Sequence, residues 1–215
     1  MALKSGNAAT ETDEVSETFA LGGGLEQPLR ALTRVLEDRY ADLAHHGGSV
    51  SGYAAMTAHE LGLEPERVER IGLAGELHDV GKVGLREEIL RKPGKLNESE
   101  WQQIKCHPQI GADLLYSCNL DDVGSWVLSH HERPDGQGYP HGMGADEIPV
   151  ESRILAVADA YDAMRSERVY KAPMTHEEAG AELMREAGSQ FDTHVVETFL
   201  EALSRLGRPA RAAKR

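Results

Sequence analysis

Apolar residues recur at intervals of three or four positions along most of this chain, from Leu25 to Leu203. This spacing places them on one face of an α-helix, whereas a half-buried β-strand alternates apolar and polar residues. The sequence contains no alternating run of β-branched residues. We therefore predict an all-α fold, built as a single compact helical bundle.

Local signals mark several of the predicted helix starts. Pro65 stands where a helix can begin, because proline is tolerated in the first turn. Asp192 is the expected N-cap of the last helix. The pattern also predicts a helix that begins at Val50, just after His46, and an earlier helical face over Leu29 to Leu36. Two residue pairs fit the capping-box pattern: Asn97 with Glu100, and Thr175 with Glu178.

Three segments differ from this helical pattern. Residues 1–24 are polar and acidic, so we interpret them as a disordered arm or linker. Residues 207–215 form a basic tail, which is either a solvated, frayed end or a weak docking segment. The predicted domain therefore spans residues 25–206. Within it, residues 132–150 are irregular, and a loop of that length inside a compact domain is usually functional.

The charge and the cysteine content limit the classes of function. The 215 residues include 23 basic and 36 acidic side chains, and the net charge of −13 argues against binding to a nucleic-acid polymer. A small anionic substrate stays compatible with this charge if the site holds metal cations. The two cysteines, Cys106 and Cys118, fit a reducing compartment, so we expect a cytoplasmic protein with Cys106 buried as a small apolar residue. No apolar stretch is long enough to span a membrane.

Five of the ten histidines, together with two aspartates, stand in contexts that favour metal binding. Most of them lie in doublets or next to predicted helix ends. One aspartate lies inside an apolar helical run, where a carboxylate needs a hydrogen-bond partner or a metal. The candidate ligands are His46, His78, Asp79, His107, His130, His131 and Asp159. The other five histidines lack such neighbours, and we expect them to be ordinary surface or core residues.

Imidazoles and carboxylates without thiolates suit iron, manganese, nickel or zinc. Seven ligands are too many for one octahedral ion that keeps open positions, so we expect two divalent ions that share a bridging carboxylate. Two ions about 3.5–4 Å apart are suited to phosphoester hydrolysis, because one lowers the pKa of a bridging water and both hold the phosphate.

Several sequence elements occur together and in a fixed order. They are residues 49–53 (SVSGY), 77–82 (LHDVGK), 92–94 (KPG), 107–108 (HP) with Gly111, 130–132 (HHE), 135–140 (DGQGYP) and 153–164 (RILAVADAYDAM). Over about residues 35–203 the chain resembles the HD-GYP family, a subgroup of the HD-domain metal phosphohydrolases. The resemblance implies an all-helical phosphodiesterase that converts cyclic di-GMP to pGpG and, in some members, to GMP, by attack of a hydroxide that bridges the metals.

The resemblance also implies a role for each candidate residue. One metal is held by His46, His78, Asp79 and Asp159, and Asp79 bridges to a second metal held by His107, His130 and His131. Lys82 is the further catalytic residue implied beside Asp79, near the scissile phosphate, where its charge stabilises the transition state. Substrate binding is implied for Asp162, Arg168 and Lys171. For the two basic residues the alternative is a solvated helix end.

The glycine-rich loop contains Asp135, Gly136, Gly138, Tyr139 and Pro140. One interpretation is a tight turn that needs glycine. The other is a wall of the metal site, because the loop starts four residues after His131. In the family this loop is implicated in contacts with diguanylate cyclase (GGDEF) domains, which are therefore expected partners besides cyclic di-GMP.

Two positions depart from the family pattern. Ser49 stands where the family often has arginine, and Asp42 stands where some members have a glutamate that helps to hold a third metal. Because aspartate is one methylene shorter than glutamate, we expect Asp42 to accept a hydrogen bond that orients His46, and we expect two metals per chain. The alternative for Asp42 is a helix-surface acid without a role.

Two other functions stay open. One is a catalytically weak HD-GYP module that binds cyclic di-GMP or docks onto proteins, although such modules usually lose ligands and this chain keeps all seven. The other is a general HD-domain nucleotidase, which does not need the DGxGYP element.

Overall fold

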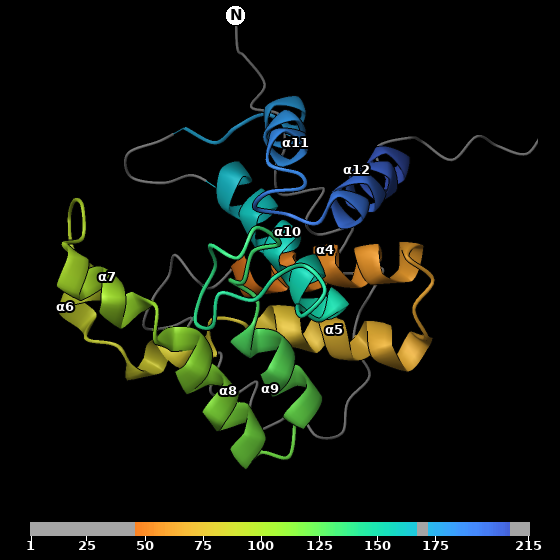
Figure 1. Ribbon diagram of the computed structural model, residues 1–215. Coiled ribbons are helices and arrows are strands. Elements are labelled where there is room, and N and C mark those ends of the chain that lie inside the picture. Colours follow the sequence, from red (N-terminus) through yellow and green to blue (C-terminus); the bar gives the residue numbers. More distant parts are fainter. Residues whose placement is uncertain (1–45, 167–171, 207–215) are drawn as a thin grey trace, which may run out of the picture.

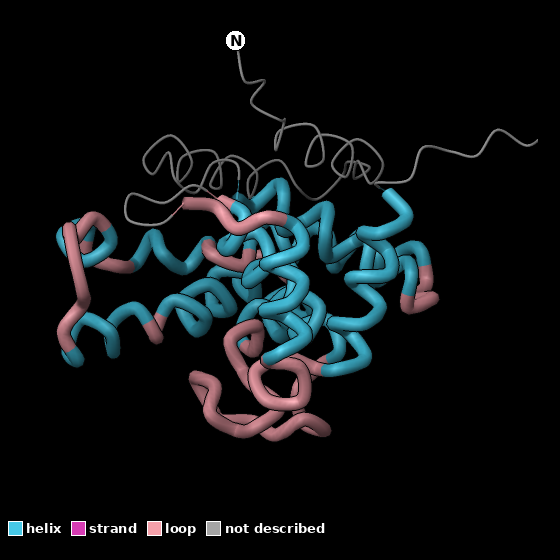
Figure 2. The backbone as a smooth tube through the Cα atoms, turned by 90° about the horizontal axis from the view of Figure 1, so that it is seen from above, coloured by secondary structure: helices cyan, strands magenta, loops and turns pink. Residues whose placement is uncertain are grey.

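The structure is a computed structural model that describes residues 46–166 and 172–206. Figure 2 shows these residues as helices joined by loops, and the only β-type pairings among them are two isolated bridges. The all-α prediction is confirmed. The predicted arm over residues 1–24, the helical face over Leu29 to Leu36 and the basic tail over residues 207–215 lie outside the described residues. No helix in the described ranges is long and apolar enough to cross a membrane.

The described helices, in chain order, are α4 (His46–Glu60), α5 (Pro65–Leu77), the 3-10 helix η1 (Val80–Gly84), α6 (Glu87–Leu90), α7 (Glu98–Ile104), α8 (His107–Ser117), α9 (Asp121–Leu128), α10 (Val150–Arg165), α11 (His176–Arg185) and α12 (Thr193–Leu206). Both predicted capping boxes are present, at the starts of α7 and α11. Asp192 caps α12, where its Oδ1 accepts a hydrogen bond from the Val195 amide at 3.1 Å. One predicted start is wrong, because α4 already includes His46 and does not begin at Val50.

Helices α4 and α10 form the centre of the bundle. Both are buried around most of their circumference. Helices α5, α10 and α12 pack on α4 from different sides (Figure 1), and α10 in turn contacts α4, α5, α11 and α12. Three aromatic rings join α4, α10 and α12 edge to face, with centroid distances of 5.0–5.8 Å: Tyr53, Tyr161 and Phe199. This core fixes the relative positions of the helices that carry His46 and Asp159.

A close backbone contact places η1 against the first turn of α8. A Cβ atom built on Gly81 would lie 1.9 Å from the carbonyl oxygen of His107 and 2.5 Å from the amide nitrogen of Gly111. Only glycine fits at such a distance, so this residue lets the turn that carries Asp79 approach the turn that carries His107.

The predicted burial of Cys106 is wrong. Cys106 is exposed, and its Sγ donates a hydrogen bond to the carbonyl oxygen of Gln102. The reason is local, because Cys106 precedes α8 and the next residue, His107, takes the inward position. Cys118 is also exposed, and both thiols are free.

Candidate metal centre

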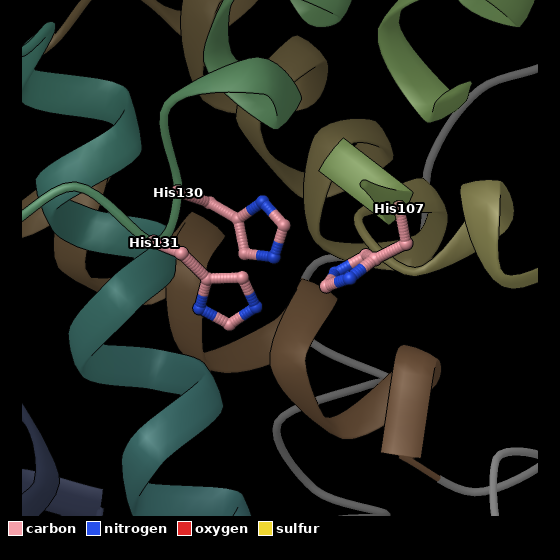
Figure 3. A group of neighbouring side chains, drawn as sticks. All are labelled: His107, His130 and His131. Atoms are coloured by element: carbon pink, nitrogen blue, oxygen red, sulfur yellow. The ribbon is translucent and has the colours of Figure 1, made fainter. Parts of the chain in front are cut away.

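Three histidines form a compact group where α8 begins and α9 ends. One ring nitrogen from each of His107, His130 and His131 lies within 4.8 Å of the others. Figure 3 shows His130 and His131 side by side, with His107 facing them from the neighbouring helix. His107 and His130 are almost fully buried. Three imidazoles that converge in this way form a nitrogen-donor site for a divalent metal.

A second group lies beside the first, at the end of α5 and the start of α4. One ligand atom from each of His46, His78 and Asp79 lies within 4.8 Å of the others. Asp159 of α10 adjoins this group, with its Oδ1 3.0 Å from His46 Nε2 and 3.9 Å from His78 Nε2. The structure therefore brings all seven predicted ligands together, in the two groups implied by the sequence resemblance.

The carboxylate of Asp79 lies between the two groups. Its Oδ2 is 3.5 Å from His78 Nε2, and its Oδ1 is 3.4 Å from His107 Nε2. Each carboxylate oxygen thus faces a different histidine group, which is the arrangement needed for a bridging ligand. Lys82, one turn later, forms an ion pair with Oδ2 of the same carboxylate.

Backbone carbonyl groups orient three of the histidine rings. The Nδ1 atoms of His78, His107 and His130 lie 2.5–2.7 Å from the carbonyl oxygen of the residue three positions earlier. An Nδ1–H that donates to this oxygen leaves Nε2 without a proton and free to bind a metal. The buried Nε2 atoms of His107 and His130 have no hydrogen-bond partner in the described part of the chain. Buried polar atoms are rarely left unpaired, so these two nitrogens fit a metal.

His46 is oriented differently, by a residue far away in the sequence. Its Nδ1 lies 2.5 Å from Oδ2 of Asp162, on α10, while its Nε2 faces Asp159. Burial opposes the charge on His46, but the hydrogen bonds with these two carboxylates raise its pKa to about 10. Without a metal, a proton on His46 therefore balances part of the negative charge of the site.

The electrostatics of the other groups favour ligand forms. Burial lowers the pKa of His107, burial and the neighbouring His131 lower that of His130 well below its usual range, and burial lowers that of His131 to about 4. Burial opposes ionisation of Asp79, yet Lys82 and the nearby histidines hold its pKa well below the ordinary value. Neutral imidazoles beside ionised carboxylates are the protonation states that metal binding requires.

The sequence comparisons agree with this geometry. The family model described as "HD domain" matches residues 30–195 of the chain. The chain belongs to the HD domain family. The "Cyclic di-GMP phosphodiesterase response regulator RpfG" of Xanthomonas campestris is 40% identical over 183 residues, which are 84% of this chain and 48% of that protein. The "3'3'-cGAMP-specific phosphodiesterase 2" of Vibrio cholerae is 38% identical over 173 residues, which are 79% of this chain and 33% of that protein.

A solved structure shares the fold of this HD domain. Bd1817, an HDG"Y"P protein from Bdellovibrio bacteriovorus, superposes with a TM-score of 0.63 at 18% identity, over 91% of this chain and 69% of that one. The resemblance to HD-GYP proteins that the sequence motifs indicated is confirmed by these matches. This chain spans about half of the length of the Xanthomonas relative and about a third of that of the Vibrio relative.

The glycine-rich loop over residues 135–140, called the signature loop from here on, folds back onto the His130–His131 segment. The amide of Tyr139 donates a hydrogen bond to the carbonyl oxygen of His131, and the two rings lie 4.8 Å apart at 31°. Gly138 permits this contact, because a Cβ there would lie 2.4 Å from the amide nitrogen of Arg133. The loop is therefore both a turn that depends on glycine and a wall of the cleft, so both interpretations of this loop from the sequence apply.

Glu132 holds this loop closed, a role that the sequence analysis missed. Its buried carboxylate accepts hydrogen bonds from the amides of His141 and Met143, at 2.6 and 3.0 Å. Its place directly after the histidine doublet was the available signal, since a carboxylate beside buried ligands needs partners.

Three predicted residues, Asp42, Arg168 and Lys171, lie outside the described residues. Asp162, predicted to bind substrate, is buried and is bonded to His46 and to Ser166 Oγ. Asp162 therefore forms the kind of orienting hydrogen bond with His46 that the sequence led us to expect from Asp42. Its spacing of three residues from Asp159 was a signal, because such pairs share a helix face.

We expect Asp162→Ala to weaken metal binding by roughly 10- to 100-fold, because His46 loses the carboxylate that orients its ring. Asp162→Asn keeps an oxygen that accepts from Nδ1–H, so its loss should be smaller. Titration of the apo protein with Mn²⁺ measures both. An alanine variant with wild-type affinity would show that the Asp162–His46 contact does not support a metal ligand.

Proposed function

We propose that this chain is the catalytic domain of a metal-dependent phosphodiesterase that hydrolyses cyclic di-GMP to pGpG, and further to GMP if the linear product binds again. The observation that carries the proposal is the position of Asp79. A carboxylate with one oxygen toward each of two histidine groups is suited to hold two metal ions close together.

The proposed ligands of one ion are His46, His78, Asp79 and Asp159, and those of the other are His107, His130, His131 and the shared Asp79. Two such ions would lower the pKa of a water and hold the phosphate of the substrate. Nitrogen and carboxylate donors without sulfur favour iron or manganese, with nickel or zinc as alternatives.

The chain supplies a cleft beside this centre. It has a volume of about 430 Å³, within the usual range for small-molecule sites, and its walls include His130, His131, Asp159 and Tyr139. Lys82 forms an ion pair with Asp79, and we assign to its ammonium group the stabilisation of the negative charge that develops on the phosphate. Because Lys82 pairs with Asp79 in this structure, metal binding to Asp79 would release it for this role.

A substrate panel tests the proposal and separates its alternatives. The metal-loaded chain should convert cyclic di-GMP to pGpG, with products resolved by chromatography, and should leave dGTP intact. Hydrolysis of dGTP alone would indicate a general nucleotidase. Binding of cyclic di-GMP without turnover would indicate a docking module. The cGAMP-specific relative makes 3'3'-cGAMP the second candidate substrate, to be compared in the same assay.

We expect two metal ions per chain, because the ligands grouped above complete two sites and the shorter Asp42 adds no third. Anomalous diffraction at the metal edge, with elemental analysis of anaerobically purified protein, measures the number. Three anomalous peaks, with Asp42 bonded to the third, would contradict this expectation.

The contact of the signature loop with GGDEF domains stays a prediction.

A further inference from the structure

Three of the residues that line the cleft are not among the proposed metal ligands. Trp101 of α7, Lys105 at the end of that helix and Tyr139 of the signature loop all line the cleft. Trp101 is 40% exposed, although tryptophan carries one of the largest apolar surfaces of any side chain. An exposed aromatic residue in the wall of a cleft is a candidate for ligand contact.

The ring of Tyr139 neighbours both the metal centre and Trp101. The ring of Tyr139 lies 4.8 Å from that of His131, and the ring of Trp101 lies 6.4 Å from that of Tyr139. Tyr139 therefore contacts both a proposed metal ligand and Trp101, so a base stacked on Trp101 would lie one aromatic side chain away from the metal centre.

The cation in this wall, Lys105, has no acidic partner among the described residues. Lys105 Nζ lies 5.9 Å from the centre of the Trp101 ring and 5.7 Å from that of Tyr139. Within residues 46–166 and 172–206, no carboxylate lies within ion-pair distance of Lys105. In a chain of net charge −13, a cation left unpaired beside a phosphate-binding site is available to an anionic ligand.

Packing does not explain the position of Trp101. None of the residues of α7 is buried, so this helix does not use its tryptophan to join the core. The helix is instead held at its N-terminus by the Asn97–Glu100 capping box and by an ion pair from Lys92 to Glu100. A helix fixed in this way presents Trp101 to the cleft without covering it.

We propose that Trp101, Tyr139 and Lys105 form a nucleotide subsite, in which the indole stacks on a purine base and the ammonium group contacts a phosphate. This inference rests on the proposed function for the substrate class, a cyclic purine dinucleotide. Stacking tolerates any base, because every base has a π-face. The subsite therefore contributes affinity for guanine and adenine alike and does not select between them.

The test compares Trp101→Ala with Trp101→Phe in the full chain. Loss of base stacking should raise KM for both cyclic di-GMP and 3'3'-cGAMP by roughly 5- to 150-fold, and phenylalanine should restore most of the affinity. Met184→Ala removes another exposed apolar side chain, on α11, and should leave KM unchanged. Lys105→Gln should weaken binding and reduce its dependence on salt.

Fluorescence supplies a readout that is independent of turnover. The second tryptophan, Trp126, is buried, so stacking of cyclic di-GMP should quench mainly the fluorescence of the exposed Trp101. The Trp101→Ala variant should not show this quenching. If the wild-type chain hydrolyses cyclic di-GMP while Trp101→Ala keeps the wild-type KM, the subsite is wrong and the proposed function stands. If quenching occurs without turnover, the subsite stands and the proposed function is wrong. Absence of both overturns both.

Discussion

Replacing Asp79 with alanine is expected to abolish hydrolysis of cyclic di-GMP and to lower the metal content of the purified protein. Its two carboxylate oxygens face His78 and His107, so one side chain joins both proposed metal sites. Loss of this bridge removes both a ligand and the spacing between the ions, and we expect turnover to fall by about 10³-fold or more. Steady-state kinetics and elemental analysis of the same preparation measure the two effects.

Asp113→Ala is the matched control for this prediction. It removes an exposed aspartate from α8, the helix that begins at His107, and should leave turnover and metal content at wild-type values. Thermal unfolding of both variants in EDTA separates loss of metal from loss of fold. Full metal occupancy with normal turnover in Asp79→Ala would refute the bridging assignment.

Gly81→Ala is expected to be among the most damaging substitutions outside the proposed ligand set. The added Cβ would overlap the carbonyl oxygen of His107 and crowd the amide of Gly111, so η1 and α8 would have to separate. Overpacking of this kind costs about 1–3 kcal/mol and sometimes more, and we expect the upper end because both neighbours are backbone atoms. The displacement also moves Asp79 and His107 apart, so turnover should fall together with stability.

Gly48→Ala provides the contrast for this substitution. Gly48 lies in α4, and a Cβ there would meet no other described residue within 4 Å. Alanine should therefore stabilise the helix by roughly 0.5–1 kcal/mol through a lower entropy of the unfolded chain. Denaturant unfolding of both variants gives the comparison. Equal stability of Gly81→Ala and the wild type would show that η1 and α8 tolerate separation.

Features that depend on neighbours in the sequence were predictable. The capping boxes at Asn97 and Thr175 and the start of α5 at Pro65 involve groups within one helical turn, so the sequence carries the whole interaction. The ligand set was predictable because the motifs are dense and ordered, and the structure brings those residues together in two groups.

Features that depend on distant packing were not predictable. The bond between His46 and Asp162 joins residues 116 positions apart, and the contact of Gly81 with His107 depends on how η1 meets α8. The inward side of a helix start is likewise set by tertiary packing, which is why Cys106 was wrongly expected to be buried. Trp101 has no marker in the sequence, since its proposed role depends on the cleft that it lines together with residues of the signature loop.

The three histidines that bond to the carbonyl oxygen three residues earlier behave as self-contained units. In His78, His107 and His130 the ring and the carbonyl oxygen that orients it lie within four consecutive residues, so the orientation of each ring is set locally. Rotation of these rings is therefore not expected to adjust the metal–ligand distances for ions of different size. The selectivity of the proposed metal centre for ions of different radius would instead depend on the distances between helix ends, and we expect core substitutions far from the ligands to alter it.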